Sequence, residues 1–372
     1  MKLWFVLTFT IFPWAAIHAQ ATVFATDLVS PVKLKVTSGD GLVVSEAGTG
    51  ANDGRLSLVD RNGVVRPLIE GLPSGLGVTG NPSGPTDLLL RECCLIEIAI
   101  GEGDTLRLGD AGGEVPNPAG PSSPLFSSIL RIRFSHPIDQ LAGGFVLTRD
   151  DHDTLADGFR VRLKSPSNEI ANVRLVIDFK DFRPDPITGV RGSQPFGMVR
   201  QPVHWQRLVA DAAQNSIVMT QRRNPPQTLL RFDPVPNPLP FGPPVSDAVP
   251  TSIRHARGDR FFVTLFVGFP FAPGTSSVRV FDLGDRSEQE LISGLTSPAD
   301  VLPIGSDLYV LELTANLLEG APGRLLRFDM PPGAPDVVAS GLIGPTGMAH
   351  DESRRAIFVA ENFTGRIMRV DL

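Results

Sequence analysis

The stretch that decides the fold runs from residue 298 to residue 342 and holds four short segments in a fixed order. They are Pro298-Ala299-Asp300, Leu308-Tyr309-Val310-Leu311-Glu312, Arg324-Leu325-Leu326-Arg327-Phe328-Asp329 and Val337-Val338-Ala339-Ser340-Gly341-Leu342. The same order restarts at Pro345-Thr346-Gly347. A repeat of roughly 50 residues that carries four short strands is typical of a β-propeller blade. The stretch therefore predicts an all-β fold built from blades.

The number of blades follows from the Pro-led starts of the repeat. These starts are Pro31, Pro85, Pro195, Pro250, Pro298 and Pro345. They are separated by 54, 110, 55, 48 and 47 residues, so the economical count is six blades. The one long interval predicts an inserted β-hairpin over about residues 135–180, followed by the returning outer strand of blade two. A seventh blade in this interval is the alternative.

The last repeat lacks its fourth strand, because the chain stops at Leu372 directly after the third. At the other end, the segment 23–31 matches the segment 338–345 in composition and spacing. We therefore expect a six-bladed β-propeller that is closed by pairing of an N-terminal strand with the C-terminal blade. Such closure removes an exposed sheet edge.

The first residues have the composition of a secretory signal. Met1-Lys2 precedes an apolar run, and Ala19-Gln20-Ala21 is a small-residue cleavage pattern. We expect residues 1–21 to be a signal peptide, residues 22–372 to form the propeller, and the product to be periplasmic or secreted. No run is long enough for a membrane span. The net charge of −6 disfavours a nucleic-acid partner, and we expect a monomer.

A candidate site lies where the channel opens between the blades. The start of an innermost strand and the end of its antiparallel neighbour meet at the same face of a blade. The strand starts offer Lys33, Asp87, Thr251, Asp300 and Thr346, and the second strands end at Glu46, Asp211, Leu265, Glu312 and Glu361. The sequence therefore predicts that a ligand contacts Glu46, Asp211, Glu312, Glu361, Thr251 and Thr346.

Several carboxylates at one mouth repel one another, and a divalent cation would relieve that repulsion. Asp87 and Asp300 belong to opposite blades of a six-bladed ring and are the predicted metal ligands. Oxygen ligands of this kind favour calcium or magnesium. The alternative is that these acids are turn residues that bind the backbone of the next loop. Asp150-Asp151-His152-Asp153 is likewise either a solvated loop tip or a cation site.

Parts of the chain resemble a known family. Val43-Val44-Ser45-Glu46-Ala47-Gly48, Val65-Arg66-Pro67-Leu68-Ile69-Glu70-Gly71-Leu72 and Val267-Gly268-Phe269-Pro270-Phe271 are similar to segments of exported NHL-like propellers of the ScyD/ScyE type. The resemblance implies a secreted or periplasmic propeller without established catalytic residues. Leu265 departs from the pattern, because it replaces an acid that the family tends to carry.

Two functions remain open at this point. The first is a non-catalytic propeller that binds a small molecule or a protein at the channel mouth. The second is a metal-dependent hydrolase or lactonase, in which Asp87 and Asp300 hold the cation and Glu46 or Glu361 is the base. No complete catalytic constellation is visible in the sequence to decide between them.

Cys93 and Cys94 are the only cysteines of the chain. They follow the first strand of blade two, so we expect them in the turn to the second strand, at the face opposite the acids. Both a vicinal disulfide, which an exported protein could form, and a pair of buried thiols are consistent with the sequence.

Overall fold

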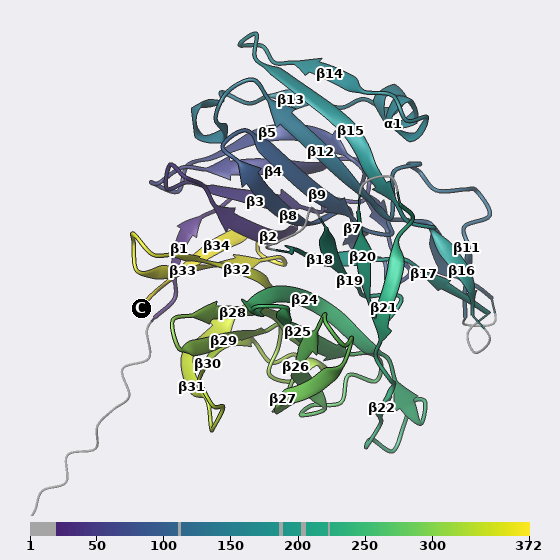
Figure 1. Ribbon diagram of the computed structural model, residues 1–372, viewed down its shortest axis with the longest axis vertical. Helices are drawn as coiled ribbons and strands as arrows, with labels where there is room; N and C mark the ends of the chain where they lie inside the picture. Colours follow the sequence, from purple (N-terminus) through teal and green to yellow (C-terminus); the bar gives the residue numbers. More distant parts are fainter. Residues whose placement is uncertain (1–19, 111–112, 186–188, 202–205, 222–223) are drawn as a thin grey trace, which may run out of the picture.

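The computed structural model describes residues 20–372 except 111–112, 186–188, 202–205 and 222–223. The predicted signal peptide therefore lies almost entirely outside the described residues. The strands form six blades around a central channel, as the repeat predicts (Figure 1). Each innermost strand contacts the next in the order β2, β8, β18, β24, β28, β32, and β32 contacts β2 again. The count of six confirms that the long interval adds an insertion to blade two and not a seventh blade.

The first three blades run from the channel outward as follows. Blade one consists of β2 (Pro31–Val36), β3 (Leu42–Glu46), β4 (Gly54–Val59) and β5 (Val65–Leu72). Blade two consists of β8 (Pro85–Glu92), β9 (Leu95–Ile100), β12 (Ser128–Phe134) and β15 (Ile170–Asp178). Blade three consists of β18 (Pro195–Arg200), β19 (Arg207–Asp211), β20 (Ser216–Thr220) and β21 (Gln227–Arg231).

The second half of the ring has the same pattern. Blade four consists of β24 (Ala248–Arg257), β25 (Arg260–Val267), β26 (Ser276–Asp282) and β27 (Glu288–Leu295). Blade five consists of β28 (Pro298–Ile304), β29 (Asp307–Glu312), β30 (Gly323–Asp329) and β31 (Asp336–Leu342). Blade six consists of β32 (Pro345–Asp351), β33 (Ala356–Glu361), β34 (Arg366–Asp371) and β1 (Thr22–Ala25).

The ring is closed by the N-terminal strand, as predicted. In Figure 1 the purple β1 lies beside the yellow β34, and Thr22 pairs with Arg369 in an antiparallel register. The Phe24 ring packs on the Phe358 ring with their centroids 4.7 Å apart. Ala25 is buried in the apolar layer between blades six and one. The closing strand thus contributes core contacts as well as backbone hydrogen bonds.

Every blade has an irregular register directly after its repeated proline. The pairing of the first strand with the second shifts just beyond Pro31, Pro85, Pro195, Pro250, Pro298 and Pro345. Such bulges twist a strand and change where its side chains point. Side chains that follow the bulge, among them Lys33, Asp87 and Asp300, meet one another across the channel.

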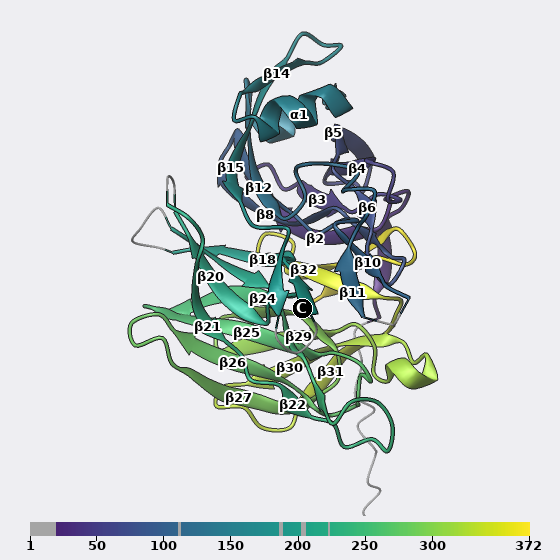
Figure 2. The same ribbon diagram turned by 90° about the vertical axis from the view of Figure 1, so that its right-hand side faces the viewer.

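The insertion of blade two is more than the expected β-hairpin. It contains a 3-10 turn η1 (Ile138–Gln140), β13 (Phe145–Val146), helix α1 (Arg149–Ala156) and β14 (Val161–Lys164). β13 adds to β5 of blade one in parallel, whereas β14 pairs with β15 of blade two. Figure 2 shows α1 above the outer strands of both blades. The insertion thus bridges blades one and two at their outer edge.

Residues 150–153 form part of α1 and not the expected loop tip. Thr148 caps the helix, since its hydroxyl accepts the N–H of Asp151 and the Asp151 carboxylate accepts the N–H of Thr148. His152 is buried, with Nε2 donating to the Gly71 carbonyl at 2.7 Å and Nδ1 accepting from the Ser123 hydroxyl at 3.0 Å. The histidine therefore fastens the helix to the blades.

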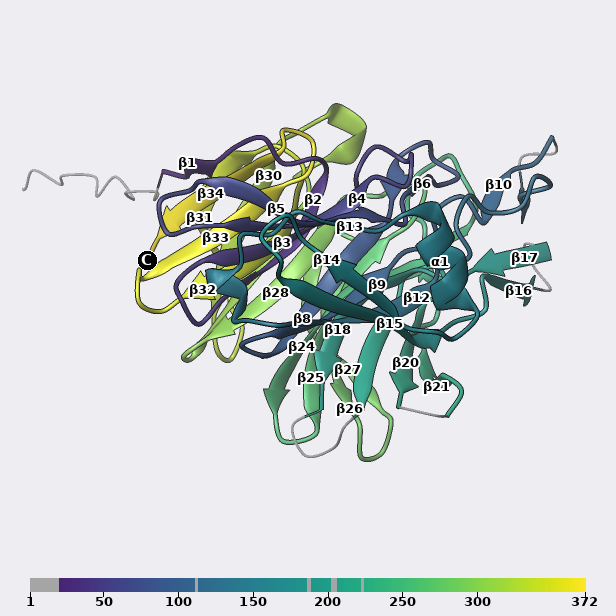
Figure 3. The same ribbon diagram turned by 90° about the horizontal axis from the view of Figure 1, so that it is seen from above.

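We call the face that holds the repeated prolines and the ends of the second strands the loop face, and the opposite face the turn face. Four small hairpins connect strands at the loop face: β6 (Gly75–Leu76) with β7 (Pro82–Ser83), β10 (Leu106–Leu108) with β11 (Glu114–Pro116), β16 (Phe182–Asp185) with β17 (Gly189–Gly192), and β22 (Val235–Pro236) with β23 (Val245–Ser246). The short helix η2 (Leu317–Glu319) lies in another connection of this face. Strands β11 and β17 are in contact and project side by side in Figures 1 and 3.

No helix among the described residues has the length and hydropathy that a membrane span needs.

Candidate functional site

The predicted acids of the channel mouth occupy one structural position in four blades. Each ends a second strand opposite the repeated proline, in the pairs Pro31 with Glu46, Pro195 with Asp211, Pro298 with Glu312 and Pro345 with Glu361. Blades two and four have Ile100 and Leu265 at this position, and neither side chain can take the place of a carboxylate. The acids therefore do not form a complete ring.

All four acids are buried and bind the backbone of the loop that enters their own blade. Each carboxylate accepts a hydrogen bond from one backbone N–H group. Glu46 accepts from Val29 at 2.5 Å, Asp211 from Gln194 at 2.9 Å, Glu312 from Thr296 at 2.7 Å and Glu361 from Ile343 at 2.8 Å. Arginines balance two of the charges, since Arg55 lies 2.8 Å from Glu46 and Arg324 lies 2.5 Å from Glu312. These bonds are those of turn residues. Ligand binding by the same side chains stays a prediction.

The predicted threonines hold neighbouring blades together at the channel. Thr251 donates its hydroxyl to the Pro298 carbonyl at 2.8 Å, and Thr346 donates to the Pro31 carbonyl at 3.1 Å. Thr86, which the sequence did not single out, donates to the Pro195 carbonyl at 2.6 Å. The three hydroxyls thus link blades two, four and six to blades three, five and one.

Asp87 and Asp300 are equivalent residues of opposite blades, as predicted, and both are buried. Each carboxylate accepts a backbone N–H from the following blade, Asp87 from Met198 at 2.8 Å and Asp300 from Met348 at 3.1 Å. Asp300 also accepts from the Ser252 hydroxyl at 2.5 Å. The two aspartates therefore connect the first strands of successive blades.

Lys33 fills the channel beside Asp300. Its Nζ lies 3.4 Å from Asp300 Oδ2 and donates to the carbonyls of Ala299 and Thr346, both at 2.8 Å. The side chain is 1% exposed. Burial lowers the pKa of Lys33, and the negative charge of Asp300 opposes that change. One lysine thus joins blades one, five and six.

Two further cations complete this cluster. Arg254 Nη2 donates to Asp300 Oδ2 at 2.7 Å, and Lys35 Nζ lies 3.5 Å from Asp87 Oδ1. Burial alone would raise the pKa of Asp300, but Arg254 and Lys33 hold it far below its usual range. Burial, followed by the charge of Arg254, lowers the pKa of Lys35 to about 8. Three cations therefore surround two carboxylates.

This arrangement does not fit the predicted calcium or magnesium site. The prediction assumed that Asp87 and Asp300 lack counter-charges, whereas Lys33, Lys35 and Arg254 supply them. Within the described part of the chain, no three His, Cys, Asp or Glu side chains lie together as a metal site requires. A cation placed here would meet the positive charges of the cluster. The sequence missed the cluster because its members come from strands far apart in the chain.

Glu102 is a further candidate that sequence reasoning missed. It follows β9 at the loop face, and its N–H donates to the side-chain oxygen of Gln194. Burial, and then the negative charges of Glu114 and Asp211, raise the pKa of Glu102 to about 8. A carboxylic acid that stays protonated near neutral pH can donate a proton or a hydrogen bond. A lone Glu after a strand carries no sequence signal for this environment.

Cys93 and Cys94 lie in the turn between β8 and β9 at the turn face, where the sequence placed them. Both are free in the structure, and Cys93 is exposed. Of the two alternatives, the structure has no vicinal disulfide between them, and the free thiols are not both buried.

Comparisons with known proteins agree with the fold. No family model matches the sequence, and no curated protein matches it significantly. The chain is similar in structure to a catalytically inactive virginiamycin B lyase from Staphylococcus aureus, with a TM-score of 0.51, 13% identity, and coverage of 95% of this chain and 98% of that chain. It is also similar to a candidate glucose dehydrogenase from Thermus thermophilus, with a TM-score of 0.52, 15% identity, and coverage of 95% and 99%.

A third similar structure is a gluconolactonase from Xanthomonas campestris, with a TM-score of 0.50, 10% identity, and coverage of 94% of this chain and 88% of that chain. At such low identities the likeness shows the fold alone. The chain is a six-bladed β-propeller that shares its architecture with lyase, dehydrogenase and lactonase proteins.

Proposed function

We propose that this chain is an exported, non-catalytic β-propeller of the ScyD/ScyE type that binds a small molecule or a protein at the loop face, around the channel mouth. The observation that carries the proposal is the arrangement of the connections. The four accessory hairpins of the described residues lie at the loop face, the same face as the acids and threonines that the sequence singled out. Loops held by a rigid scaffold are where propellers and other β-folds carry binding residues.

The polar groups below these hairpins support a binding role over a metal-dependent hydrolase. Asp300 already accepts bonds from Ser252, Arg254 and Met348, and Asp87 from Met198. A cation held by these two carboxylates would meet the positive charges of Lys33, Lys35 and Arg254. These carboxylates are engaged within the protein, so we assign them to the rigidity of the channel.

A ligand screen tests the proposal. The protein that begins at Thr22 is screened by thermal shift with sugars, amino acids and aromatic acids, and each hit is examined by hydrogen–deuterium exchange. We expect a hit to protect backbone amides of β10–β11 and β16–β17. The control variant shortens the turn at residues 352–355 on the turn face and should bind equally well.

Two results would contradict the proposal. The first is that every hit protects only backbone amides of the turn face from exchange. The second is hydrolysis of sugar lactones that depends on an added divalent cation, because this would favour the hydrolase alternative.

Glu102 favours a second candidate function, which is metal-independent acid catalysis at the same face. Its carboxyl group lies beside Gly192, where an ideal Cβ would come within 2.8 Å of Oε2. If the lactones are hydrolysed without metal, Glu102→Gln should abolish turnover and leave the fold unchanged. Turnover that survives this substitution would remove Glu102 from the reaction.

A further inference from the structure

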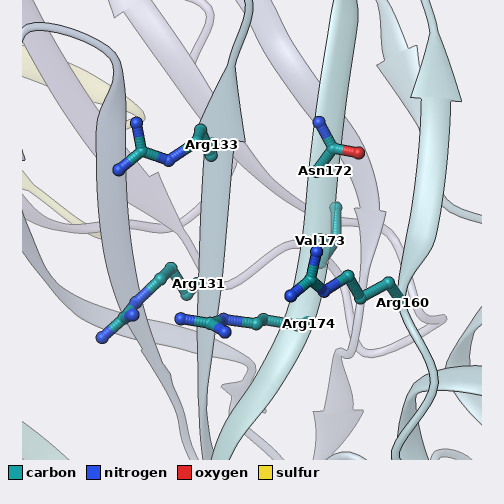
Figure 4. Close-up of a pocket in the computed structure, with 6 residues that line it drawn as sticks. All are labelled: Arg131, Arg133, Arg160, Asn172, Val173 and Arg174. Carbon is teal, nitrogen blue, oxygen red and sulfur yellow. The ribbon is translucent and has the colours of Figure 1, made fainter.

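A group of arginines lies on the flank of blade two, away from the channel. The pocket there has a volume of about 340 Å³ and is lined by Arg131, Arg133, Arg160, Asn172, Val173 and Arg174. Figure 4 shows the side chains of Arg131, Arg174 and Arg160 in one row across the strands, with Arg133 and Asn172 beyond them. We call this cavity the arginine pocket. It belongs to β12, β15 and the residue before β14.

Strand register explains why the arginines meet. Arg131 of β12 pairs directly with Arg174 of β15, and Arg133 pairs with Asn172. Val161 pairs with Val173, so Arg160, one residue earlier, lies next to Arg174. Like charges directly opposite each other across strands destabilise a sheet. The strand register therefore brings three guanidinium groups next to one another along one side of the pocket.

The nearest carboxylate is already shared by other cations. Glu97 accepts from Arg207 at 2.7 and 2.6 Å, from Arg91 at 3.0 Å and from Arg131. Burial alone would raise the pKa of Glu97, but the three arginines, Arg207 first, lower it to about 2. One negative charge is therefore divided among three guanidinium groups.

Arg133 and Arg160 have weaker counter-charges than Arg131 among the described residues. The only ion pair of Arg133 in the described part of the chain is with Glu92, at 3.4 Å between two half-exposed side chains. Exposed pairs of this kind contribute little. The Arg160 side chain is exposed, and no hydrogen bond or ion pair of it is found among the described residues. Among the described residues, the positive charges of Arg133 and Arg160 at this pocket are thus little balanced by carboxylates.

We propose that the arginine pocket binds a small ligand that carries at least two phosphoryl or carboxylate groups. The planar fork of a guanidinium group matches both oxyanions and can bind them with two parallel hydrogen bonds. Four such groups around one cavity exceed what a single oxyanion needs. The volume is that of a small-molecule site. This site is separate from the loop face and does not depend on the function proposed there.

Calorimetry with inorganic pyrophosphate, orthophosphate and citrate tests the inference at low ionic strength without divalent cations. The wild-type protein should bind pyrophosphate at least tenfold more tightly than orthophosphate, because two charged groups are engaged. Comparison of pyrophosphate with citrate then decides between phosphoryl and carboxylate ligands. Binding should weaken steeply with added salt.

Variants locate the binding. Arg160→Gln and the double change Arg160→Gln with Arg174→Gln should weaken pyrophosphate binding by about threefold and at least tenfold, respectively. The matched control is Arg61→Gln with Arg286→Gln, two exposed turn arginines in other blades, which should bind as the wild type does. Arg160 is exposed, so its single variant remains informative if the double variant fails to fold.

Three results would overturn the inference. The first is that neither pyrophosphate nor citrate binds the wild type. The second is that the Arg160→Gln variant binds pyrophosphate as tightly as the wild type. The third is that the control pair loses as much affinity as the pocket variants do. Equal affinity for orthophosphate and pyrophosphate would also overturn the requirement for two charged groups.

Discussion

Individual side chains of the channel have roles that their sequence positions predict only in part. The spacing of the repeat correctly places Asp87 and Asp300 in opposite blades. It says nothing of Lys33, whose Nζ bonds a carbonyl 266 residues away, or of Arg254. Strand periodicity determines which face a residue occupies, but a partner in another blade depends on how the ring closes. The counter-charges were therefore not predictable from one sequence.

The channel cluster predicts unequal effects for its two aspartates. Asp300→Asn leaves Lys33 and Arg254 buried without their counter-charge and should lower the free energy of unfolding by about 3 kcal/mol or more. Asp87→Asn should cost less, because the one ion pair that Asp87 forms with the described residues is with Lys35, whose side chain is 17% exposed. Urea unfolding of both variants measures the difference. An equal or larger loss for Asp87→Asn would contradict this account.

The raised pKa of Glu102 predicts a pH effect on stability. The acid is protonated in the folded protein up to about pH 8, whereas it ionises near pH 4.3 in the unfolded chain. Its contribution is therefore fully present below pH 4 and is lost as the pH rises toward 8. We therefore compare the free energy of unfolding of Glu102→Gln with that of the wild type. The difference should shift in favour of the variant by on the order of 1 kcal/mol or more as the pH rises from 5 to 8.

Thermal unfolding of both proteins over that pH range checks the Glu102 prediction. The control is Glu352→Gln, an exposed acid of the turn face, which should leave the difference between pH 5 and pH 8 unchanged. A Glu102→Gln profile parallel to that of the wild type would show that the acid is ionised in the fold.

At the level of elements, the sequence predicted strands better than it predicted the helix. Short apolar runs with period two identify the blade strands, because alternate residues face the neighbouring blades. The helix α1 has only two buried side chains, His152 and Leu155, and four charged ones. In sequence, so polar a segment of eight residues is typical of a loop. The Thr148–Asp151 capping box is its one local signal. The contacts of His152 with blade one, which also hold the helix, are not local.

The position of His152 predicts how this helix can be released. Replacement by Gln removes the Nδ1 acceptor for Ser123 or the Nε2 donor for Gly71, and should cost about 1–3 kcal/mol. Hydrogen–deuterium exchange should rise first in α1 and β14. His136→Gln, at an exposed histidine, is the matched control. Unchanged exchange in α1 would contradict the fastening role.

Acid should act in the same direction as this substitution. Burial lowers the pKa of His152, so the folded protein keeps the ring neutral. Stability from this residue is therefore present above about pH 6.5 and declines as the pH falls below that value.

For the whole molecule, the sequence predicted the blade count and the closure because both follow from a repeated pattern. Six proline-led starts and one missing outer strand leave a single economical arrangement. The accessory hairpins and the arginine pocket interrupt the pattern, so no repeat copy could indicate their position. Prediction thus succeeded where the blades are alike, whereas for blade two it gave the place of the insertion but not its form.

Closure predicts a large effect of a small truncation. Removal of residues 22–30 deletes β1, breaks its pairing with β34 and exposes an apolar sheet edge. Relative to the protein that begins at Thr22, we expect the free energy of unfolding to fall by several kcal/mol and the truncated protein to aggregate more readily. Differential scanning calorimetry and sedimentation velocity measure both effects. An unchanged melting temperature would show that the ring does not need its N-terminal strand.

The pairing of Thr22 with Arg369 also determines the order of events while the chain is made. The ribosome makes β1 before blades one to five and β34 after them, so the two strands cannot meet until those five blades have been synthesised. Contacts of such large sequence separation form slowly. Until then the nascent chain has an open strand edge at each end, and its solubility depends on whatever holds those edges apart. Of the six blades, blade six is thus the last that can be completed.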